Sequence, residues 1–517
     1  MAKVFSSPTL FEILMLVVIF IQAFYEHANG KLNLVTITAG KFSVLSAATV
    51  APAYAVAIED MSKRYPDIFA NHTVVPINVA LKVNPGTPEG DWLVVEELVK
   101  EYGAGVLRSN DPTVILNSIS ARIFSTVGDF AREDNLVTLS CGPSEPNPAR
   151  YPTNIIFYPG SAFDFGAGVI ATMDALHWRS VAVIWDLCSA LINSARVEGL
   201  LRGLLPLLER RSMDIDALVI KMDSTLEVLP KAYYSALWRA GNHSRIIVCG
   251  ILNRELLELM AAASDIGFIS GNNYVFIHVY GLEVPGEQPP GWKEMGGIDL
   301  KVREAFERLL IVRSQPLNWT QAEPLTERIV QRINTMFGIP YDAENKLNEF
   351  AIGCYESVEL LSDVLNRSGL DGHSIDPGVF MQQLKGQTFQ LTLRNVSFGP
   401  GTTRPPTIVL QKFNSLMATF QIIAKLNPSS RAWSTGDSIQ GELWNGVVPP
   451  DRPLCGIHGE RCQAQTSTAI TIGIVVAVIA TGTGFAALYW YHQRYLRVGG
   501  NVWWCLESAL TYHRVTL

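Results

Sequence analysis

Cysteine is the residue type with the most chemistry to offer in this sequence of 517 residues, which contains seven of them. They stand at positions 141, 188, 249, 354, 455, 462 and 505. Cys455, His458 and Cys462 could supply three metal ligands, but a structural zinc ion takes four. The close spacing of Cys455 and Cys462 instead favours a small disulfide loop in an oxidising compartment. The sequence alone does not choose the pairs among the other cysteines, and we expect no metal site.

A second pattern resembles a nucleotide site. Gly166, Gly168 and the later Asp186 match the glycine-rich fingerprint of dinucleotide-binding proteins. That fingerprint requires a strand immediately before the glycines, and several residues separate Tyr158 from Gly166. We therefore interpret the glycines as helix-packing positions and expect no cofactor. The sequence also lacks a nucleophile elbow, a His-Glu-x-x-His motif and a phosphate-binding loop, so we expect no catalytic residues.

Polar and aromatic residues at the ends of apolar runs are candidates for ligand binding, because ligands bind at the carboxyl ends of parallel strands. These candidates are Arg108, Ser109, Phe157, Tyr158, Trp185, Asp186, His278 and Tyr280. Simpler roles remain open for them. An aspartate at a strand end is often a turn or cap residue, and the aromatic pairs could pack a hinge.

The elements that must position these residues alternate along the chain. Apolar runs such as LNLVTITAG and VAVIWD predict strands, and residues with helical spacing lie between them, as in Ser46–Tyr65. This alternation predicts βαβ units and parallel sheets. We also expect a helix at Pro112–Arg122, a strand at Gln387–Val396 joined by a turn to a strand at Thr407–Asn414, and a linker from Asn427 to Gly446.

The length of the chain favours two lobes. The fold class we predict is therefore α/β, with a bilobal ligand-binding region at residues 31–427. The first lobe is expected at about 31–158 and 300–375, and the second at about 160–282 and 376–427. Ligand would bind between the lobes, and closure would be a hinge motion.

Two apolar segments predict a single-pass membrane protein. Residues 1–28 have the layout of a signal peptide. The uncharged run Thr468–Tyr491 is long enough to span a bilayer, and Arg494 and Arg497 mark its far end as cytoplasmic. Residues 428–467 would form a juxtamembrane linker and 492–517 a short cytoplasmic tail. We therefore expect a plasma-membrane protein with its N-terminus outside the cell, and a face of small residues in the span favours a homodimer.

Two further observations fit an extracellular region. Five Asn-x-Ser/Thr sequences lie before the span and predict glycosylation. They begin at Asn71, Asn242, Asn318, Asn366 and Asn395. The net charge is −7, and no basic block lies outside the membrane flank, so nucleic acid is not an expected partner.

The juxtamembrane sequence carries a specific resemblance. Leu443–Gly446, then Pro-Pro-Asp-Arg-Pro-Leu-Cys-Gly from Pro449 to Gly456, then Cys462, resembles the signature that precedes the span in receptor-type guanylate cyclases. The runs VAVIWD, RIIVCG and YVFI are similar to the ligand-binding region of that family. The resemblance covers residues 31 to 490. It implies a type I periplasmic-binding-protein-like fold of the natriuretic-peptide-receptor kind and a disulfide between Cys188 and Cys249.

The resemblance also defines what is unusual here. The family carries a cysteine near position 108 that would pair with Cys141, and this sequence reads GVLRSNDP there. Family members continue into kinase-like and cyclase domains, whereas this sequence reaches Leu517 without them. We therefore expect a receptor ectodomain that binds an extracellular peptide or small molecule for cyclic GMP signalling, without cyclase activity in this chain. The alternatives are a clearance or decoy receptor, and another receptor class that uses the same fold.

Overall fold

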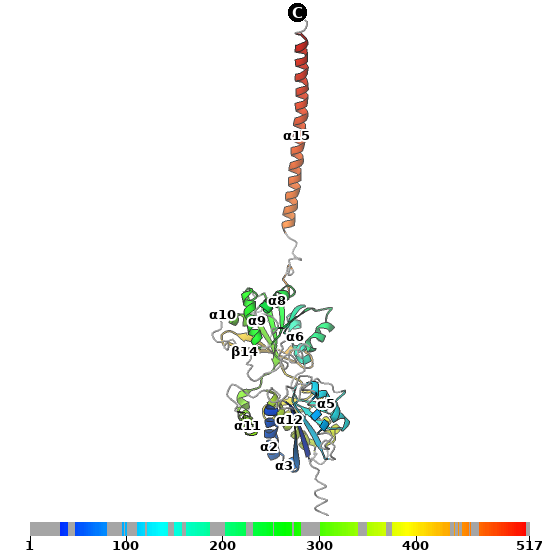
Figure 1. Ribbon diagram of the computed structural model, residues 1–517, viewed down its shortest axis with the longest axis vertical. Coiled ribbons are helices and arrows are strands. Elements are labelled where there is room, and N and C mark those ends of the chain that lie inside the picture. Colours follow the sequence, from blue (N-terminus) through cyan, green and yellow to red (C-terminus); the bar gives the residue numbers. More distant parts are fainter. Residues whose placement is uncertain are drawn as a thin grey trace, which may run out of the picture. The chain divides into compact units, whose positions relative to one another are not determined.

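The computed structural model of the chain divides into two units, residues 1–451 and 452–517 (Figure 1). The structure describes residues 32–39, 47–79, 92, 96–97, 99–100, 111–118, 121–142, 149–157, 162–186, 202–223, 231–251, 253–270, 273–280, 300–339, 349–368, 375–434, 439, 443, 447–453, 455 and 465–512. The expected signal peptide lies outside these ranges.

The first lobe is built on a five-stranded sheet in the order β2-β1-β3-β4-β5, and all its strand pairs are parallel. The strands are β1 (Leu32–Ala39), β2 (His72–Val79), β3 (Thr113–Asn117), β4 (Val137–Ser140) and β5 (Asn154–Ile156). The helices of this lobe are α2 (Ala47–Arg64), α3 (Pro66–Phe69), α5 (Ala121–Glu133), α11 (Trp319–Phe337), α12 (Glu349–Ser368) and α13 (Pro377–Leu384). A small hairpin of β11 (Thr388–Gln390) and β12 (Asn395–Ser397) completes the lobe.

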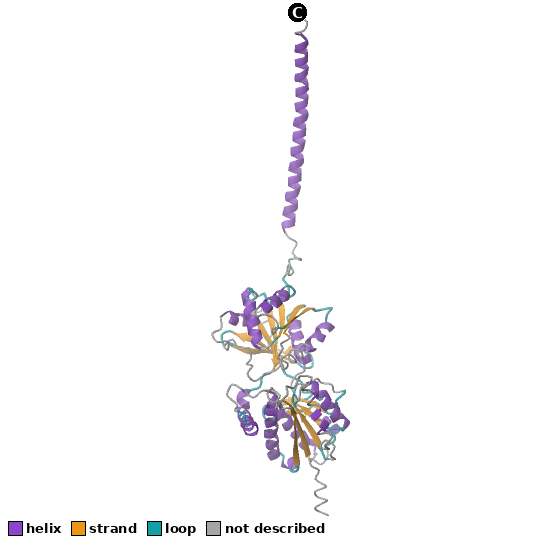
Figure 2. Cartoon of the chain, in the orientation of Figure 1, coloured by secondary structure: helices purple, strands orange, loops and turns teal. Residues whose placement is uncertain are grey.

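Alternation along the strands explains why both faces of this sheet are covered. Leu34 and Leu116 face a large cluster with residues of α2, α12 and α13. Val35 and Ile115, each adjacent in sequence to one of these leucines, face a smaller cluster with α5. The sheet is therefore a central layer with helices on both sides (Figure 2).

The second lobe is built on an eight-stranded sheet in the order β15-β14-β13-β10-β9-β8-β6-β7. Its strands are β6 (Ser180–Asp186), β7 (Asp216–Met222), β8 (Ile246–Gly250), β9 (Val275–Tyr280), β10 (Leu309–Ser314), β13 (Ile408–Asn414), β14 (Thr419–Leu426) and β15 (Trp433–Ser434). Strands β6 to β10 are parallel, and β13, β14 and β15 add antiparallel pairs. Its helices are α6 (Ala162–Ala175), α8 (Lys231–Gly241), α9 (Asn253–Asp265) and α10 (Leu300–Phe306).

The second sheet is also buried on both faces. Val183 and Val248 pack in one cluster with α6, and Ile184 and Ile247 pack in another with α8, α9 and α10. The glycines that resemble a nucleotide fingerprint lie on α6. A side-chain carbon on Gly168 would lie 2.6 Å from Cγ1 of Val312, and one on Gly166 would lie 3.0 Å from the backbone of Gly203. This confirms the prediction that these glycines serve helix packing.

Three segments of chain connect the lobes, and two hydrogen-bonded contacts join them. The first leaves β5, where Ile156 N donates to Thr402 O at 3.1 Å and Arg404 N donates to Ile156 O at 2.9 Å. The second leaves β10, where Gln315 N donates to Thr407 O at 2.7 Å. The returning segment before β13 is therefore bonded to both of the others, so the three crossings form one hinge.

Several sequence predictions about these elements are wrong. The expected helix at Pro112–Arg122 is in fact β3, whose five side chains are all buried between the two layers of helices. The expected single strand at Gln387–Val396 is the hairpin β11–β12, which does not pair with β13. The expected linker from Asn427 to Gly446 carries β15, and Ile439 and Leu443 are buried in the core of the second lobe.

The lobe boundaries also need correction. Residues 300–314, expected in the first lobe, form α10 and β10 of the second lobe, because β10 pairs with β9 and β13. Residues 377–398, expected in the second lobe, pack into the core of the first lobe through Phe380, Leu384 and Phe389. The chain therefore crosses near residues 315–318 and again near 402–407.

The second unit contains one long helix, α15 (Gln465–Tyr512). Its segment Ile472–Arg497 is long and apolar enough to cross a membrane, with a mean hydropathy of 2.0 over its most apolar 18 residues. Arg494 lies over the ring of Trp490 at 5.2 Å, at the end of the apolar segment where an aromatic belt is expected.

Candidate ligand-binding site

The carboxyl edge of the second sheet brings together several of the predicted ligand residues. The strand register pairs Trp185 with Gly250, Cys249 with His278, and Tyr280 with Arg313. Asp186 and Tyr280 therefore lie at the same level, on opposite sides of strand β8. Because side chains alternate along a strand, Asp186, His278, Tyr280 and Arg313 share the face that carries Ile184 and Phe276. An acid, an imidazole, a phenol and a guanidinium thus gather at one edge.

Tyr280 and Arg313 form the best-defined pair at this edge. The guanidinium carbon of Arg313 lies 4.7 Å from the centre of the Tyr280 ring. Both side chains are buried, and Nε of Arg313 donates to the backbone oxygen of Ser314 at 3.2 Å. A cation held over a ring face is attracted by the ring's negative face, and burial strengthens the attraction. The pair is therefore a fixed cationic group at the end of β9 and β10.

His278 is oriented by the backbone of the neighbouring strand. Its Nδ1 lies 3.2 Å from the carbonyl oxygen of Cys249, and since a carbonyl only accepts, Nδ1 is the donor. Its ring centre lies 6.1 Å from that of Tyr280. His278 is buried and lies two residues before Tyr280 on the same face of β9.

Trp185 and Asp186 lie at the other end of this row of side chains. The Asp186 side chain is buried, whereas Trp185 is half-buried on the opposite face, with Nζ of Lys221 5.1 Å from its ring centre. Asp186 thus places a carboxyl group opposite the Tyr280–Arg313 pair. Groups of opposite charge on two sides of one strand suit a ligand that carries both an acid and a base.

Phe157, a further predicted ligand residue, does not join this row. Phe157 is buried in the core of the first lobe, and the guanidinium carbon of Arg404 lies 5.1 Å from its ring centre. It therefore packs against the hinge, which was the alternative left open for it. Arg108, Ser109 and Tyr158 lie outside the described residues.

The hinge contains a pocket of about 230 Å³ that the sequence did not predict. It is lined by Ser314, Gln315, Pro316, Leu317, Asn318, Glu349, Leu393, Arg394, Asn395, Arg404 and Thr407. Ser314 ends β10, so the pocket begins where Arg313 leaves the row described above. The other residues come from the crossings, from the starts of α11 and α12, and from the β11–β12 hairpin.

Ion pairs fix the position of the charged side chains in the wall of this pocket. Arg394 donates to Glu356 through Nε at 2.9 Å and Nη2 at 2.7 Å, and to Glu349 through Nη1 at 3.1 Å. Burial alone would lower the pKa of Arg394, but these two carboxylates outweigh it and raise that pKa. Nη1 of Arg404 lies 3.8 Å from Glu356. Because breaking a buried ion pair leaves an uncompensated charge, this cluster favours one arrangement of the hinge.

The sequence analysis missed Arg313 and the hinge arginines for two different reasons. Strand β10 was not recognised, although LLIVRS has the same form as VAVIWD, an apolar run followed by a polar residue. A search for that form would have found Arg313. Arg394 and Arg404 lie in short loops, far in the sequence from residues 314–318 and 349 that share their pocket, and no local pattern joins them.

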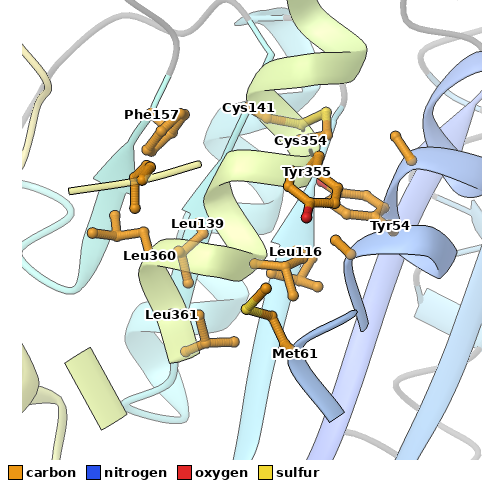
Figure 3. Packing of buried hydrophobic residues seen from close by; sticks show 14 of the residues in the cluster. Tyr54, Met61, Leu116, Leu139, Cys141, Phe157, Cys354, Tyr355, Leu360 and Leu361 are labelled. Carbon is orange, nitrogen blue, oxygen red and sulfur yellow. Dashed lines mark hydrogen bonds between the residues drawn. A yellow bond between two sulfur atoms is a disulfide. The ribbon is translucent and has the colours of Figure 1, made fainter. Parts of the chain in front are cut away.

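The disulfides differ from the expected pattern. Cys141 is bonded to Cys354, so the end of β4 is joined to α12 across 213 positions (Figure 3). Cys249, expected to pair with Cys188, is a free buried thiol on the face of β8 that packs against α8 and α9, and burial raises the pKa of this thiol. Cys188 lies outside the described residues. Cys455 is disulfide-bonded, and its expected partner Cys462 also lies outside them.

The five asparagines predicted to carry glycans are all exposed: Asn71, Asn242, Asn318, Asn366 and Asn395. Asn318 caps α11 through Oδ1, which accepts from the backbone N of Gln321 at 3.3 Å. The amide nitrogen of its side chain is the atom to which a sugar attaches, so capping leaves that atom available. Glycosylation remains a prediction for all five.

Comparison with known proteins supports the resemblance seen in the sequence. No family model matches the chain. Over 254 residues it is 24% identical to the receptor-type guanylate cyclase gcy-28 of Caenorhabditis elegans. The match covers 46% of this chain and 19% of that protein, so the chain spans about a fifth of its relative. Among solved structures, a periplasmic binding protein from Burkholderia mallei matches with a TM-score of 0.49 and 11% identity, covering 80% of this chain and 99% of the other.

Two conclusions follow. The fold, read from the strand order itself, is α/β with two parallel-sheet lobes, as predicted from the sequence. The predicted resemblance to receptor-type guanylate cyclases is confirmed over part of the chain. The described part of the chain is thus a bilobal α/β region followed in the sequence by one helix that is long and apolar enough to cross a membrane.

Proposed function

We propose that this chain is the ligand-binding and membrane-spanning part of a cell-surface receptor of the guanylate cyclase kind. The observation that carries the proposal is the 24% identity to a receptor-type guanylate cyclase over 254 residues. Residues 1–28 would be a signal peptide, the two lobes would lie outside the cell with glycans on the exposed sequons, and α15 would cross the plasma membrane once. The chain would act as a homodimer and bind ligand rather than catalyse a reaction.

The site we propose for ligand is the row Asp186, Tyr280 and Arg313 at the carboxyl edge of the second sheet. A buried carboxyl group and a buried guanidinium would bind the amino and carboxylate groups of an amino acid or the end of a short peptide. Binding would close the hinge between the lobes, and the change would pass through the Cys455 loop to the span. Inside the cell, this movement would control cyclic GMP synthesis.

A chimaera tests the proposal. Residues 1–497 would be joined to the intracellular half of the C. elegans relative and expressed in cultured cells. The cells would be exposed to a panel of free amino acids and to fractionated secreted peptides, and cyclic GMP would be measured. We expect at least one probe to raise cyclic GMP, and Arg313→Gln to abolish the response while the exposed surface variant Arg132→Gln retains it.

Thermal unfolding of the full chain in lipid nanodiscs, with the same probes, separates binding from signalling. A probe that stabilises the chain but leaves the chimaera silent would favour a clearance receptor. If none of the probes stabilises the chain or activates the chimaera, ligand binding of this class is contradicted.

A further inference from the structure

The amino edge of the second sheet carries apolar side chains that are open to solvent. Met213 lies in the turn before β7 and is 99% exposed. Val447 is 71% exposed, two residues before the buried Pro449. Trp238 lies in the last turn of α8 and is 55% exposed. Large apolar side chains that gather at one place on a surface commonly mark an interaction site.

These three residues belong to the same edge of the sheet as the point where the chain leaves the lobes. Asp451 is the last residue of the first unit, and it is bonded to the first residues of β6 and to Arg245, just before β8. Strands β7, β6 and β8 are neighbours in the sheet. Met213 comes just before β7, and Trp238 lies in the last turn of α8, the helix that precedes β8. Val447 lies in the segment that leads to the exit.

The chain that follows is short. Residues 452–464 separate Asp451 from the start of α15. Even a fully extended segment of this length spans only about 45 Å, at about 3.5 Å per residue. This length sets an upper limit on the distance between Asp451 and the start of α15, and a limit of this size allows the second lobe to reach the surface that α15 enters.

The charges at this edge are balanced. Arg179 and Arg211 both pair with Asp174, at 2.8 Å and 2.5 Å, and Arg211 also lies 3.9 Å from Asp214, so two arginines face two carboxylates. A surface with no excess of positive charge gains little from anionic lipids. Tryptophan, by contrast, is enriched where protein meets the headgroup region, because one end of its ring is apolar and the other can hydrogen-bond.

We propose that Met213, Trp238 and Val447 form a contact surface for the headgroup region of a zwitterionic membrane, the same membrane that α15 crosses. The proposal rests on the proposed function for the membrane attachment of the chain, and adds that the second lobe itself lies against the lipid. Contact would limit the tilt of this lobe, so that ligand-driven movement would reach the span as a rotation in the membrane plane.

Two further exposed apolar residues lie at this edge of the sheet but do not belong to the contact surface. Leu416 and Met417, at the tip of the β13–β14 hairpin, lie at the same edge of the sheet. Three steps of strand order separate β13 from β8, and neighbouring strands twist by about 20° to 25° each. The hairpin tip therefore points well away from Asp451, where the chain leaves the lobe, so the contact surface does not include it.

Oxidation of the native methionines provides the test. The full chain, produced in a glycosylating host, would be placed singly in phosphatidylcholine nanodiscs and, in parallel, in an amphipol that offers no bilayer plane. Hydrogen peroxide would then oxidise exposed methionines, and peptide mass spectrometry would give the rate at each one. Met336, on α11 of the first lobe and 47% exposed, is the matched reference.

In amphipol we expect Met213 to oxidise faster than Met336, as their exposure requires. In nanodiscs we expect the rate at Met213 to fall at least threefold and the rate at Met336 to stay the same. Trp238→Asp should remove most of the protection of Met213, whereas Val379→Asp, an exposed change in the first lobe, should not.

Three results would overturn the proposal. Equal rates at Met213 in both media would show that lipid does not cover it, including the case in which a glycan on the nearby Asn242 keeps the lobe off the bilayer. Protection that appears only in discs loaded with two chains would assign the surface to a second copy. Failure of the chain to enter nanodiscs would contradict the proposed membrane attachment itself, and is distinguished from the other two because no loaded discs form.

Discussion

The carboxylate oxygen Oδ2 of Asp451 lies 2.7 Å from the backbone nitrogen of Ser180. The same oxygen accepts from the backbone nitrogen of Arg179 at 2.6 Å. The backbone oxygen of Asp451 accepts from Arg245 N at 2.9 Å, and Pro449 O accepts from Nε1 of Trp178 at 2.8 Å. The Pro-Pro-Asp part of the juxtamembrane motif is thus bonded to the amino ends of β6 and β8. The chain leaves the second lobe from a fixed point.

Replacing Asp451 with alanine should free the juxtamembrane segment from the amino ends of β6 and β8. Hydrogen bonds to a charged acceptor contribute about 1.5–3 kcal/mol when buried, and partial exposure here reduces the expected loss to about 1–2 kcal/mol. Hydrogen–deuterium exchange at the amides of Arg179 and Ser180 should then rise about tenfold, because 1.4 kcal/mol corresponds to a factor of ten.

Asp376→Ala is the matched control for this prediction. Asp376 caps α13 in the first lobe, where its Oδ1 accepts from Gly378 N at 2.7 Å and from Val379 N at 3.2 Å. Its removal should leave exchange at Arg179 and Ser180 unchanged. Equal increases in both variants would mean that the second lobe simply loses stability, and would contradict a local anchor.

The Cys141–Cys354 disulfide should account for much of the stability of the first lobe. The bond joins residues 213 positions apart and is buried beside Tyr54 and Tyr355 (Figure 3). Chain-entropy arguments give about 5 kcal/mol for a loop of this size. We expect Cys354→Ser to lower the free energy of unfolding by several kcal/mol, as measured by urea denaturation.

Reduction of the native chain should reproduce this loss, and unfolding of the first lobe should no longer respond to reductant in the double variant Cys141→Ser, Cys354→Ser. Cys249→Ala keeps the disulfide and should keep the response. A native chain that reductant does not destabilise would contradict the prediction.

Local pattern was sufficient to predict most of the fold. Apolar runs such as RSVAVIWD and SRIIVCG are buried on both faces, and they became β6 and β8 as expected. Local pattern failed where a short apolar run is compatible with both a helix and a strand. β3 was predicted as a helix because its five residues stand among polar ones. The partner of Cys141 could not be predicted, because Cys354 reaches it only after the chain has passed through the second lobe and returned.

The candidate site was partly predictable for the same reason. Trp185, Asp186, His278 and Tyr280 were found because each ends a recognisable strand, and the structure places them at one sheet edge. Arg313 was missed with its strand. The hinge pocket is formed by loops that meet only in three dimensions, so no periodicity or spacing could indicate it.

Acid should weaken the contact between α2 and α11. Asp60 accepts from Nη1 and Nη2 of Arg328 at 2.8 Å and 2.6 Å, and from the hydroxyl of Tyr355 at 2.9 Å. Burial alone would raise the pKa of Asp60, but these donors outweigh it and lower that pKa. The resulting stability is present above the ordinary aspartate pKa of about 3.9, and is lost as pH falls through the lower value in the folded protein.

Urea denaturation between pH 6 and pH 3 measures this effect. Asp60→Asn should lose about 1 kcal/mol at pH 6, and the difference from the native chain should shrink towards pH 3. Glu59→Gln, which alters a more exposed pair with Arg332, should have a smaller effect. A difference between Asp60→Asn and the native chain that does not change with pH would exclude Asp60 as the titrating group.

Close packing of α6 against β10 should make Gly168 intolerant of any side chain. An added carbon would lie 2.6 Å from Cγ1 of Val312 and 3.2 Å from Cγ2 of Ile408. Valine is stiff at its first side-chain torsion, so Val312 cannot turn away easily. We expect Gly168→Ala to cost about 1–3 kcal/mol, despite the better helix propensity of alanine.

Gly399→Ala is the control for that change, because no atom lies within 4 Å of the added carbon. It should leave the urea midpoint almost unchanged. The position of Gly168 also gives the variant a functional consequence, since Val312 directly precedes Arg313. A shift of β10 away from α6 would move the guanidinium off the Tyr280 ring. Gly168→Ala should therefore weaken binding of any probe that stabilises the native chain, whereas a destabilised variant with native affinity would show that β10 absorbs the strain without moving Arg313.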